Sequence, residues 1–446
     1  MDFLKKWSIS SILVVALFVG CNNDETEPSV VTTIRNLYLT SVDSVESVNN
    51  ALFYVNADTF FVYKGVEYTG FIQNRDSMLY GSSLKAVIPT ITTKAVVSTI
   101  VLNDSVTYSG TDTMDFELPV KVLVYAQNAD TTQRYLIKSN VHQIDHELYL
   151  WDERTYPTTS STIKAEKAVL FSDKIFLFRN INNVAMLDVS TDFAEGWQSV
   201  ALEGLAVNAI EHIICADKFY AVADDKFFVS SDGETWTSNT ITDVSIKQLL
   251  FKEGNALFAL AQDSVVMSSD EGGSWQLAYR CPESFPVQDY AVVAEKSPSG
   301  RMRYLLVGGT AKDGTSAGAW STENGIYWVD FSQDGDNWPC RKNAATIAYD
   351  HNVLMFGGEE NGVLSDSILL SPDFGFTWTG ADEKIVARNY VPTIKSSIFS
   401  TRNLLNASKN QYRIFIVGGK DKDKDGSYVQ KIWTGRKNET YFNEYR

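Results

Sequence analysis

A short turn motif that ends in tryptophan recurs in the C-terminal part of this sequence, and it limits the possible folds more than any other feature. Two segments, 268–275 and 371–378, fit the pattern S-x-D-x-G-x-[ST]-W. Three imperfect copies follow the same plan: 230–236, which is one residue shorter, 321–328, which has Glu323 at the acid position, and Asp192 with Trp197, which lacks the glycine at its usual place. Self-similarity of this kind is the signature of a repeat architecture.

Each position of the motif has a local structural task. The aspartate accepts hydrogen bonds from backbone N–H groups in a tight turn, the glycine supplies a positive φ, and the tryptophan buries its indole under the hairpin. We therefore interpret the acids and tryptophans of the motif as structural rather than catalytic residues. They are Asp192, Asp232, Asp270, Glu323, Asp373, Trp197, Trp236, Trp275, Trp328 and Trp378.

The spacing of the motifs predicts the architecture. Copies lie roughly 40 to 50 residues apart, which leaves room for four short strands and their loops. A second signature, an apolar run ending in two glycines, recurs at a spacing of roughly 50 to 60 residues. Its copies are Leu306–Gly309, Met355–Gly358 and Ile416–Gly419, and we interpret these glycines as packing points.

The tryptophan motif resembles the Asp box of sialidase-like β-propellers, and the diglycine runs resemble kelch repeats. The resemblance implies a six-bladed propeller at 144–446, in an all-β protein. Seven blades are the alternative if 149–151 belongs to a blade of its own. We favour 149–151 as the strand that closes the ring against the last blade, because an open sheet edge invites aggregation.

The part of the sequence before the propeller has a different pattern. Between residues 34 and 143, about seven short runs alternate apolar and polar residues, as in 120–126. Alternation with period two predicts strands, and strands of this length and spacing are typical of a β-sandwich. The segment from Tyr108 to Ile137 resembles the final strands of Ig-like domains at the front of Bacteroidota surface lipoproteins. We therefore expect an Ig-like β-sandwich at 34–143.

The first residues have the pattern of an export signal. In 1–20, two lysines precede an apolar run that is shorter than the roughly 20 residues of a membrane-spanning helix. The segment 17–21 resembles the lipobox of bacterial lipoproteins, with Phe18 where leucine is usual. The resemblance implies cleavage before Cys21 and attachment of a diacylglycerol to its thiol, which would anchor the protein to a membrane.

A polar, acidic stretch follows Cys21, and we interpret 21–33 as the lipidated cysteine and a solvated tether. It resembles the acidic tag by which Bacteroidota lipoproteins reach the outer face of the outer membrane. The alternative is a plain linker in a protein that faces the periplasm. We expect a protein that is lipid-anchored to the outer membrane and faces the cell surface.

Composition excludes one class of partner. The chain has 39 lysine and arginine residues against 55 aspartate and glutamate residues, a formal net charge of −16. Nucleic-acid affinity rests on clustered cations, so we expect no nucleic acid as partner. Beyond Cys21 the cysteines are Cys215, Cys281 and Cys340, a number and spacing that predict neither a disulfide framework nor a metal site. A pairing of Cys281 with Cys340 stays open.

Two candidates for chemistry remain. The resemblance to sialidases would imply an arginine triad, a Tyr–Glu nucleophile pair and an acid/base aspartate. The arginines here show no regularity from blade to blade, so we assign no catalytic residue. Asp421, Asp423 and Asp425 open a D-x-D-x-D-G calcium loop, although its twelfth position is Ile432 instead of glutamate. These three residues are the candidate Ca²⁺ site, and the alternative is a solvated turn.

Taken together, the lipobox, the Ig-like domain and the mixed propeller resemble a family of Bacteroidota lipoproteins that is defined only by domains of unknown function. We expect a non-catalytic recognition role in which the propeller binds an extracellular glycan or an envelope protein. One alternative is a sialidase-like or other glycan hydrolase. Another is a structural scaffold of an envelope complex.

Overall fold

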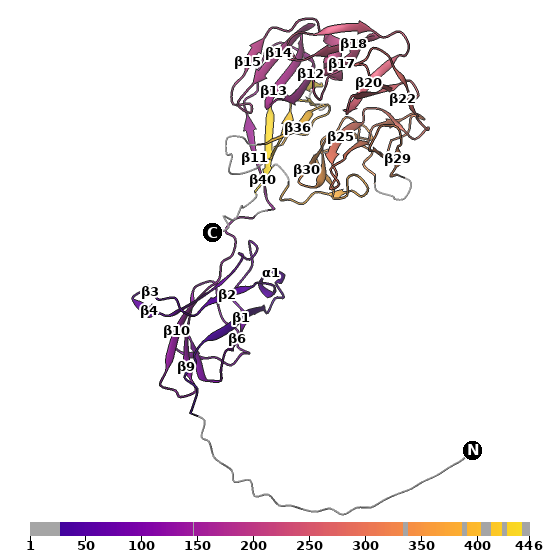
Figure 1. The fold of residues 1–446 in the computed structure, drawn as a ribbon. Coiled ribbons are helices and arrows are strands. Elements are labelled where there is room, and N and C mark those ends of the chain that lie inside the picture. The colour runs from indigo at the N-terminus through magenta and orange to yellow at the C-terminus, as the bar shows by residue number, and fades with distance from the viewer. Residues whose placement is uncertain are drawn as a thin grey trace, which may run out of the picture. The chain divides into compact units, whose positions relative to one another are not determined.

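The structure is a computed structural model of the chain, shown in Figure 1. The residues that it describes are 27–145, 147–332, 338–385, 390–402, 412–421 and 426–438. The chain divides into two compact units, Met1–Asp145 and His146–Arg446, and the division lies two residues after the predicted boundary. The protein is all-β, as the sequence predicted.

The helical elements within the described residues are short. They are the α-helix α1 (Glu46–Asn49) and the 3₁₀ helix η1 (Val207–His212). None of the helices in this described part has the length and apolar character that crossing a membrane requires.

The described residues of the first unit form ten strands, where the sequence predicted about seven. The additional strands are short and carry too few residues for a periodic pattern. The strands are β1 (Ile34–Ser41), β2 (Phe53–Asn56), β3 (Phe61–Tyr63), β4 (Val66–Tyr68), β5 (Gly70–Asn74), β6 (Val87–Thr93), β7 (Val97–Leu102), β8 (Val106–Thr107), β9 (Val120–Ala126) and β10 (Thr132–Lys138).

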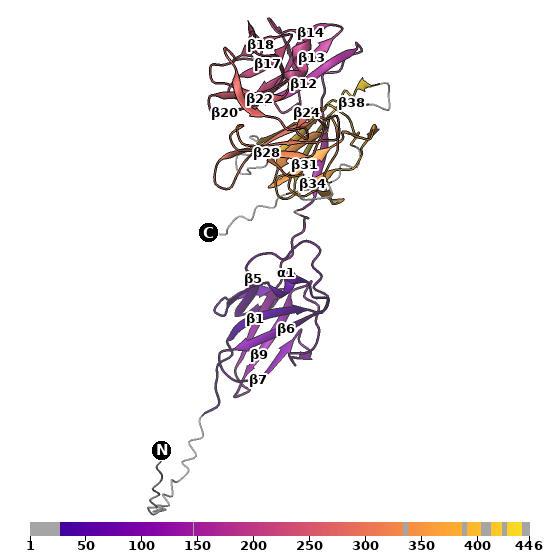
Figure 2. The same cartoon turned by 90° about the vertical axis from the view of Figure 1, so that its right-hand side faces the viewer.

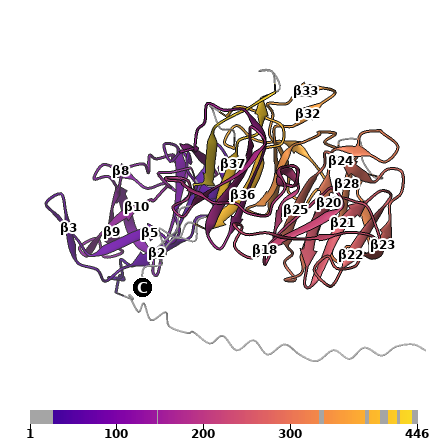
Figure 3. The same cartoon turned by 90° about the horizontal axis from the view of Figure 1, so that it is seen from above.

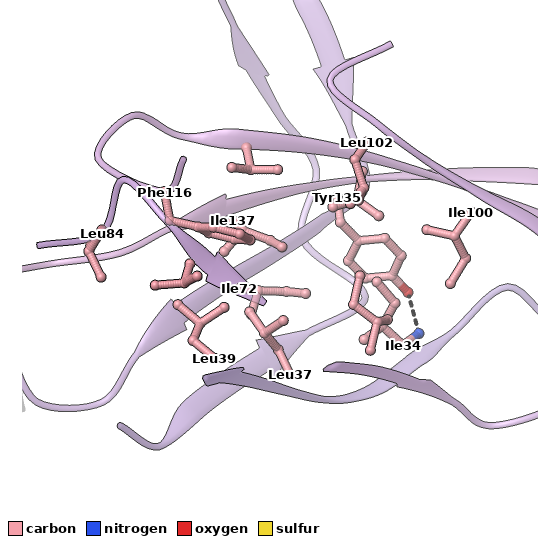
Figure 4. Close-up of a cluster of buried hydrophobic side chains, with 14 of the residues drawn as sticks. Ile34, Leu37, Leu39, Ile72, Leu84, Ile100, Leu102, Phe116, Tyr135 and Ile137 are labelled. Atoms are coloured by element: carbon pink, nitrogen blue, oxygen red, sulfur yellow. Dashed lines mark hydrogen bonds between the residues drawn. The ribbon is translucent and has the colours of Figure 1, made fainter. Parts of the chain in front are cut away.

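These strands form a six-stranded sheet in the order β2-β5-β10-β9-β7-β8, a two-stranded sheet of β1 and β6, and the β3–β4 hairpin. Strict alternation of buried and half-buried residues along β9 turns one side of the large sheet toward β1 and β6. One hydrophobic cluster joins the two sheets (Figure 4). At its centre the buried Tyr135 hydroxyl accepts a hydrogen bond from the Ile34 N–H at 3.1 Å.

The second unit contains six four-stranded antiparallel sheets in its described residues. They are numbered along the chain, and the sheet that contains β36, β37 and β40 is sheet 6. Sheet 1 has β12 (Ile163–Phe171), β13 (Lys174–Ile181), β14 (Val184–Ser190) and β15 (Gln198–Val200). Sheet 2 has β16 (Ile214–Cys215), β17 (Phe219–Ala223), β18 (Lys226–Ser230) and β19 (Thr237–Thr240). Sheet 3 has β20 (Ile246–Glu253), β21 (Ala256–Ala261), β22 (Ser264–Ser268) and β23 (Gln276–Arg280).

Sheets 4 to 6 have the same four-stranded plan. Sheet 4 has β25 (Ala291–Lys296), β26 (Met302–Val307), β28 (Ala319–Thr322) and β29 (Val329–Asp330). Sheet 5 has β30 (Ala345–Tyr349), β31 (Asn352–Phe356), β34 (Leu369–Ser371) and β35 (Thr379–Gly380). Sheet 6 has β36 (Ser397–Arg402), β37 (Tyr412–Val417), β40 (Ile432–Lys437) and β11 (Tyr149–Arg154).

Hydrophobic clusters between neighbouring sheets arrange them in a closed ring. For example, Phe219 of sheet 2 packs with Phe178 of sheet 1. Phe415 of sheet 6 shares a cluster with Ile175 and Leu177 of sheet 1, which closes the circle. The other neighbours are joined in the same way, sheet 2 to 3, 3 to 4, 4 to 5 and 5 to 6.

The strand order gives the ring two different faces. Within each sheet the first-to-second and third-to-fourth turns lie at one end of the strands, which we call the turn face. The second-to-third connections and the links to the next sheet lie at the other end, the connection face. Three small two-stranded pairs extend these connections: β24 (Pro286–Gln288) with β27 (Thr310–Ala311), β32 (Glu359–Glu360) with β33 (Val363–Leu364), and β38 (Lys420–Asp421) with β39 (Ser427–Tyr428). Figure 2 labels β24 and β38, and Figure 3 labels β32 and β33.

The ring is completed by strands from both ends of the second unit. The strand β11 is the fourth strand of sheet 6 and pairs with β40 from Tyr149↔Lys437 to Arg154↔Ile432. The prediction that 149–151 closes the ring against the last repeat is therefore confirmed by the register.

Candidate functional site

The tryptophan motifs form the connections between the third and fourth strands of sheets 1 to 5. We call the five segments 190–197, 230–236, 268–275, 322–328 and 371–378 the Trp turns. In the two full copies the aspartate is bound to its own turn. Asp270 Oδ1 accepts hydrogen bonds from the Ser268 hydroxyl at 2.7 Å and the Ser274 N–H at 2.9 Å. Asp373 is held in the same way by Ser371 and Thr377.

The hydrogen bonds from the Ser268 and Ser274 hydroxyls lower the pKa of Asp270 to about 2. In three of the turns the indole N–H donates to the carbonyl of the motif glycine: Trp236 to Gly233 at 3.0 Å, Trp328 to Gly325 at 3.0 Å and Trp378 to Gly375 at 3.2 Å. Trp275 is buried as well. These contacts use the motif residues to fasten the turn.

The fourth Trp turn corrects the alignment made from sequence. Asn324, and not Glu323, takes the acid position: its Oδ1 accepts hydrogen bonds from the Ile326 N–H at 2.9 Å and the Tyr327 N–H at 3.0 Å. Thr322 supplies the hydroxyl that Gly325 N–H binds. Glu323 is half-exposed and lies 3.6 Å from Arg301. The turn therefore has the shorter form, with the same hydrogen bonds that Asp232 makes in 230–236.

We expect this difference to be measurable in stability. Asn324→Ala should lower the free energy of unfolding by about 1–2 kcal/mol, because two turn N–H groups lose their acceptor. Glu323→Ala should change it by less than about 0.5 kcal/mol, since an exposed ion pair contributes little. Urea denaturation of the two variants and the parent protein measures both values. Equal losses would contradict the reassignment of the turn.

The degenerate first copy keeps the geometry without the glycine. Ala194 stands at the glycine position with φ of +65° and donates its N–H to the Ser190 hydroxyl at 2.9 Å. Asp192 accepts from the Gly196 N–H at 2.9 Å, and the Trp197 indole donates to the Thr155 carbonyl at 2.7 Å. The sequence of this copy is degenerate, but its aspartate and tryptophan still make hydrogen bonds that hold the turn in place.

The Trp turns also join neighbouring sheets. A Cβ at Gly272 would lie 2.6 Å from the Phe227 ring of sheet 2, and one at Gly375 would lie 2.6 Å from the Leu305 side chain of sheet 4. Each glycine thus lets its turn rest on the preceding sheet. The acids of the motif lie on the turn face, bound within their turns.

The diglycines connect sheets at the opposite, connection face. Gly309 N–H donates to the Arg341 carbonyl and Gly358 N–H donates to the Thr393 carbonyl, each at 2.9 Å, and both acceptors precede the first strand of the next sheet. Gly419 N–H instead donates to Glu166 Oε1 of sheet 1 at 2.6 Å. At the point where the ring closes, a side-chain carboxylate takes the place of a main-chain carbonyl.

Glu166 is almost completely buried, and both of its carboxylate oxygens have partners. Glu166 Oε2 accepts a hydrogen bond from the Tyr156 hydroxyl at 2.7 Å. Arg179 lies over the Tyr156 ring and forms a buried ion pair with Asp188. Burial raises the pKa of Glu166 to about 7, against the lowering effect of the hydrogen bonds from Gly419 and Tyr156. This carboxyl therefore exchanges its proton near neutral pH.

A second group of charged residues gathers on the connection face from separate segments. We call it the Glu211 cluster: Glu211 at the end of η1, Lys167 on β12, Lys395 before β36, and Lys420 and Tyr428 on the β38–β39 hairpin. Glu211 Oε2 accepts from Lys395 Nζ at 2.9 Å, and Glu211 Oε1 accepts from the Tyr428 hydroxyl at 3.2 Å. Lys420 Nζ lies 3.8 Å from Glu211 Oε1 and 5.0 Å from the centre of the Tyr428 ring.

The charges of the cluster shift one another's proton affinities. Burial raises the pKa of Glu211, but the hydrogen bond and charge of Lys395 and the charge of Lys420 outweigh it, so the net pKa is below its ordinary value. Burial lowers the pKa of Lys167, and it also lowers the pKa of the neighbouring His212. The cluster is open to solvent: the Glu211, Lys395 and Lys420 side chains are 30%, 38% and 25% exposed.

Other residues singled out from the sequence are not brought into one site. Cys215, Cys281 and Cys340 are free thiols, so Cys281 and Cys340 are not paired. Asp421 is buried on β38, whereas Asp423 and Asp425 lie outside the described residues, as does Cys21. Among the described residues no group of three His, Cys, Asp or Glu side chains is placed to hold a metal ion.

The sequence analysis missed Tyr156, Glu166 and the Glu211 cluster. Their residues come from β12 of sheet 1, from the β38–β39 hairpin, and from the segments that link sheet 6 to 1, sheet 1 to 2 and sheet 5 to 6, and no local motif marks them. One signal was present in the sequence. The diglycine runs predict close contact between neighbouring sheets. In a closed ring the last run lies against the first sheet, so its N–H group needs a hydrogen-bond acceptor from that sheet.

A ring of four-stranded antiparallel sheets, fastened by repeated turns and closed by a strand from the start of the unit, defines the second unit as a β-propeller. The chain belongs to the DUF6242 family: the model of the DUF6242 beta propeller domain matches residues 145–445. The model of the DUF6242 N-terminal domain, a domain of unknown function, matches residues 30–138. A search of curated proteins found no match.

Proposed function

We propose that this protein is a non-catalytic recognition protein that binds an extracellular glycan through the connection face of its propeller. The observation that carries the proposal is the Glu211 cluster, in which charged groups from three connecting segments and one strand meet at a solvent-open site. Loops that gather at one end of a rigid scaffold are the usual place of binding residues. Tyr428 adds an aromatic ring to the site, with the Lys420 ammonium group 5.0 Å from its centre.

The proposed architecture is an Ig-like sandwich followed by six blades, with each of the six four-stranded sheets as one blade. The single core shared by the two sheets of the first unit supports the sandwich. The hydrogen bonds of the Trp turns support their assignment as Asp boxes. In this arrangement the first domain spaces the propeller from a membrane anchor.

A glycan hydrolase is the weaker proposal. Tyr156 and Glu166 form a tyrosine–carboxylate pair, which a sialidase-like mechanism would require. Both residues are at least nine-tenths buried, and each Glu166 oxygen is already bound, one to Gly419 and one to Tyr156. Such a pair fits a structural joint better than a nucleophile, which has to reach a substrate.

A glycan-array screen of residues 22–446, run with Ca²⁺ and again with EDTA, tests the proposed function. Reproducible hits in either buffer would support glycan recognition. Hits that disappear in EDTA would further support a Ca²⁺ site that includes Asp421, Asp423 and Asp425. An absence of hits in both buffers would overturn glycan recognition by this protein.

An envelope protein is the second candidate partner, and exposed apolar side chains favour it. Tyr327, Val329 and Phe376 are 76%, 57% and 47% exposed, on or beside the Trp turns of sheets 4 and 5. Exposed apolar groups that lie together mark contact sites for proteins. Cross-linking in intact cells, followed by recovery of one stable partner, would support this candidate or a scaffold role. Its loss in Tyr327→Ser would place the contact on the turn face.

We also propose that the protein is a lipoprotein of the Bacteroidota outer membrane, anchored through Cys21 and facing the cell surface. Cells grown with a palmitate analogue should label the parent protein. Cys21→Ser should lose the label completely, because the thiol is the proposed attachment point for the diacylglycerol. Cys215→Ser, which changes a free thiol in the propeller, is the control and should keep the label. Label retained in Cys21→Ser would contradict the anchor.

A further inference from the structure

We propose that the Glu211 cluster is an anion site that binds the carboxylate or sulfate group of an acidic glycan, an inference that rests on the proposed glycan recognition. Lys167, Lys395 and Lys420 supply three ammonium groups around Glu211, and the buried Glu166 is a second carboxylate near Lys420. The lowered pKa of His212 leaves its ring uncharged at neutral pH. The cluster therefore has an excess of positive charge within a chain whose net charge is −16.

The ion pairs in the structure do not neutralise all of the positive charge of the three lysines. Lys395 is directly bonded to Glu211, whereas Lys420 lies 3.8 Å away and shares the same carboxylate. Lys167 is half-buried, and in the described part of the chain no carboxylate lies within ion-pair distance of it. Partly buried ammonium groups without full compensation are costly, and an anionic ligand would supply the missing charge.

The backbone at Lys395 gives a second, independent reason. Lys395 has φ of +60°, a left-handed conformation that side chains rarely adopt. The residues at the corresponding places before sheets 4 and 5 are Asp289 and Asn343, with φ of +57° and +55°. Short polar residues of these types tolerate this conformation best. A lysine is conformationally unfavourable at this position before sheet 6. The left-handed backbone of Lys395 positions its ammonium group against Glu211 on the connection face.

Three polysaccharides separate the possible ligands: polygalacturonate carries carboxylates, dextran sulfate carries sulfates, and dextran is the neutral match to dextran sulfate. We expect the 22–446 protein to bind one or both acidic polymers and to bind dextran more weakly, with affinity that falls as salt is raised. Binding to one acidic polymer alone would identify its group as the ligand. Equal binding of dextran and dextran sulfate would overturn the anion site.

Variants of the cluster test the site itself. Lys395→Met and Lys420→Met should each weaken binding about tenfold, the effect of losing one hydrogen bond to a charged group. Lys395→Arg should retain binding within about threefold, because it keeps the charge. Glu211→Gln should strengthen binding several-fold, because it removes the carboxylate that competes with the ligand. A cluster with only a structural role would not gain affinity in this variant.

The matched control is Lys218→Met, which breaks a Lys–Glu pair of similar geometry on the turn face, where Lys218 Nζ lies 2.7 Å from Glu271. Binding should be unchanged, and thermal melting of every variant checks that the fold is kept. If acidic glycans bind the parent and the lysine variants equally, the site is wrong while glycan recognition stands. If no glycan binds the parent, the proposed function fails together with this inference.

Discussion

Replacing Gly418 with alanine will destabilise the propeller by about 3 kcal/mol, because an added methyl group has no room and the backbone is left-handed. A Cβ at this position would lie 1.7 Å from Glu166 Oε1, and the φ of Gly418 is +58°. The clash would push apart the contact between sheets 6 and 1, where the hydrogen bond from Gly419 closes the ring. Urea denaturation of the parent protein and the variant measures the loss.

Gly362→Ala separates the two causes. Gly362 has φ of +81°, and an added Cβ there would meet no atom within 4 Å. This variant should therefore lose only about 1 kcal/mol, the cost of a left-handed alanine. A loss at Gly418 no larger than the loss at Gly362 would show that close packing against Glu166 is not needed for ring closure.

The second large effect is a pH dependence that belongs to Glu166. Burial raises its pKa in the folded protein from 4.5 to about 7. Between these two values the folded protein keeps a proton that the unfolded chain has lost, so this group makes the protein less stable as pH rises. The change amounts to about 3 kcal/mol, and it is complete above about pH 8, where the carboxyl is charged in both states.

Glu166→Gln should remove this dependence. The amide stays neutral. Its oxygen can still accept from the Gly419 N–H, and its NH₂ group can donate to the Tyr156 hydroxyl oxygen. Its stability relative to the parent should therefore rise by about 3 kcal/mol between about pH 4.5 and pH 8. Glu323→Gln, a change of the same type at an exposed site, should show no such trend. A difference between Glu166→Gln and the parent that stays constant with pH would contradict the buried titration.

The ring architecture was predictable because each repeat carries its own local signals. The Trp turns fix where the third strand ends and the fourth begins, as at Ser371 and Thr379. The diglycines mark the end of the second strand in sheets 4 to 6. A strand at 149–151 was predictable because a ring of sheets leaves one edge that needs a partner. The short strands of the first unit, such as β3 and β8, carry too few residues for periodicity to reveal them.

The candidate site was not predictable from the sequence, because its residues lie far apart in the chain and only the closed ring brings them together. Glu211 and Lys395 form one ion pair, but Glu211 belongs to the link between sheets 1 and 2 and Lys395 to the link between sheets 5 and 6. The error at Glu323 has a local cause. Ser321 and Thr322 are adjacent hydroxyl residues, so the motif can be aligned on either one. The Ser321 hydroxyl in fact donates to the Tyr304 carbonyl of the neighbouring strand.

The pairing of β11 with β40 also sets the order in which the second unit can form. β11 is made first on the ribosome, and its partner β40 is made last. Until that last strand emerges, the nascent chain carries an unpaired edge and the core between sheets 6 and 1 stays incomplete. A nascent chain that lacks β40 therefore forms an open arc of sheets. The pairing of β40 with β11 is the step that completes the native state of the whole unit.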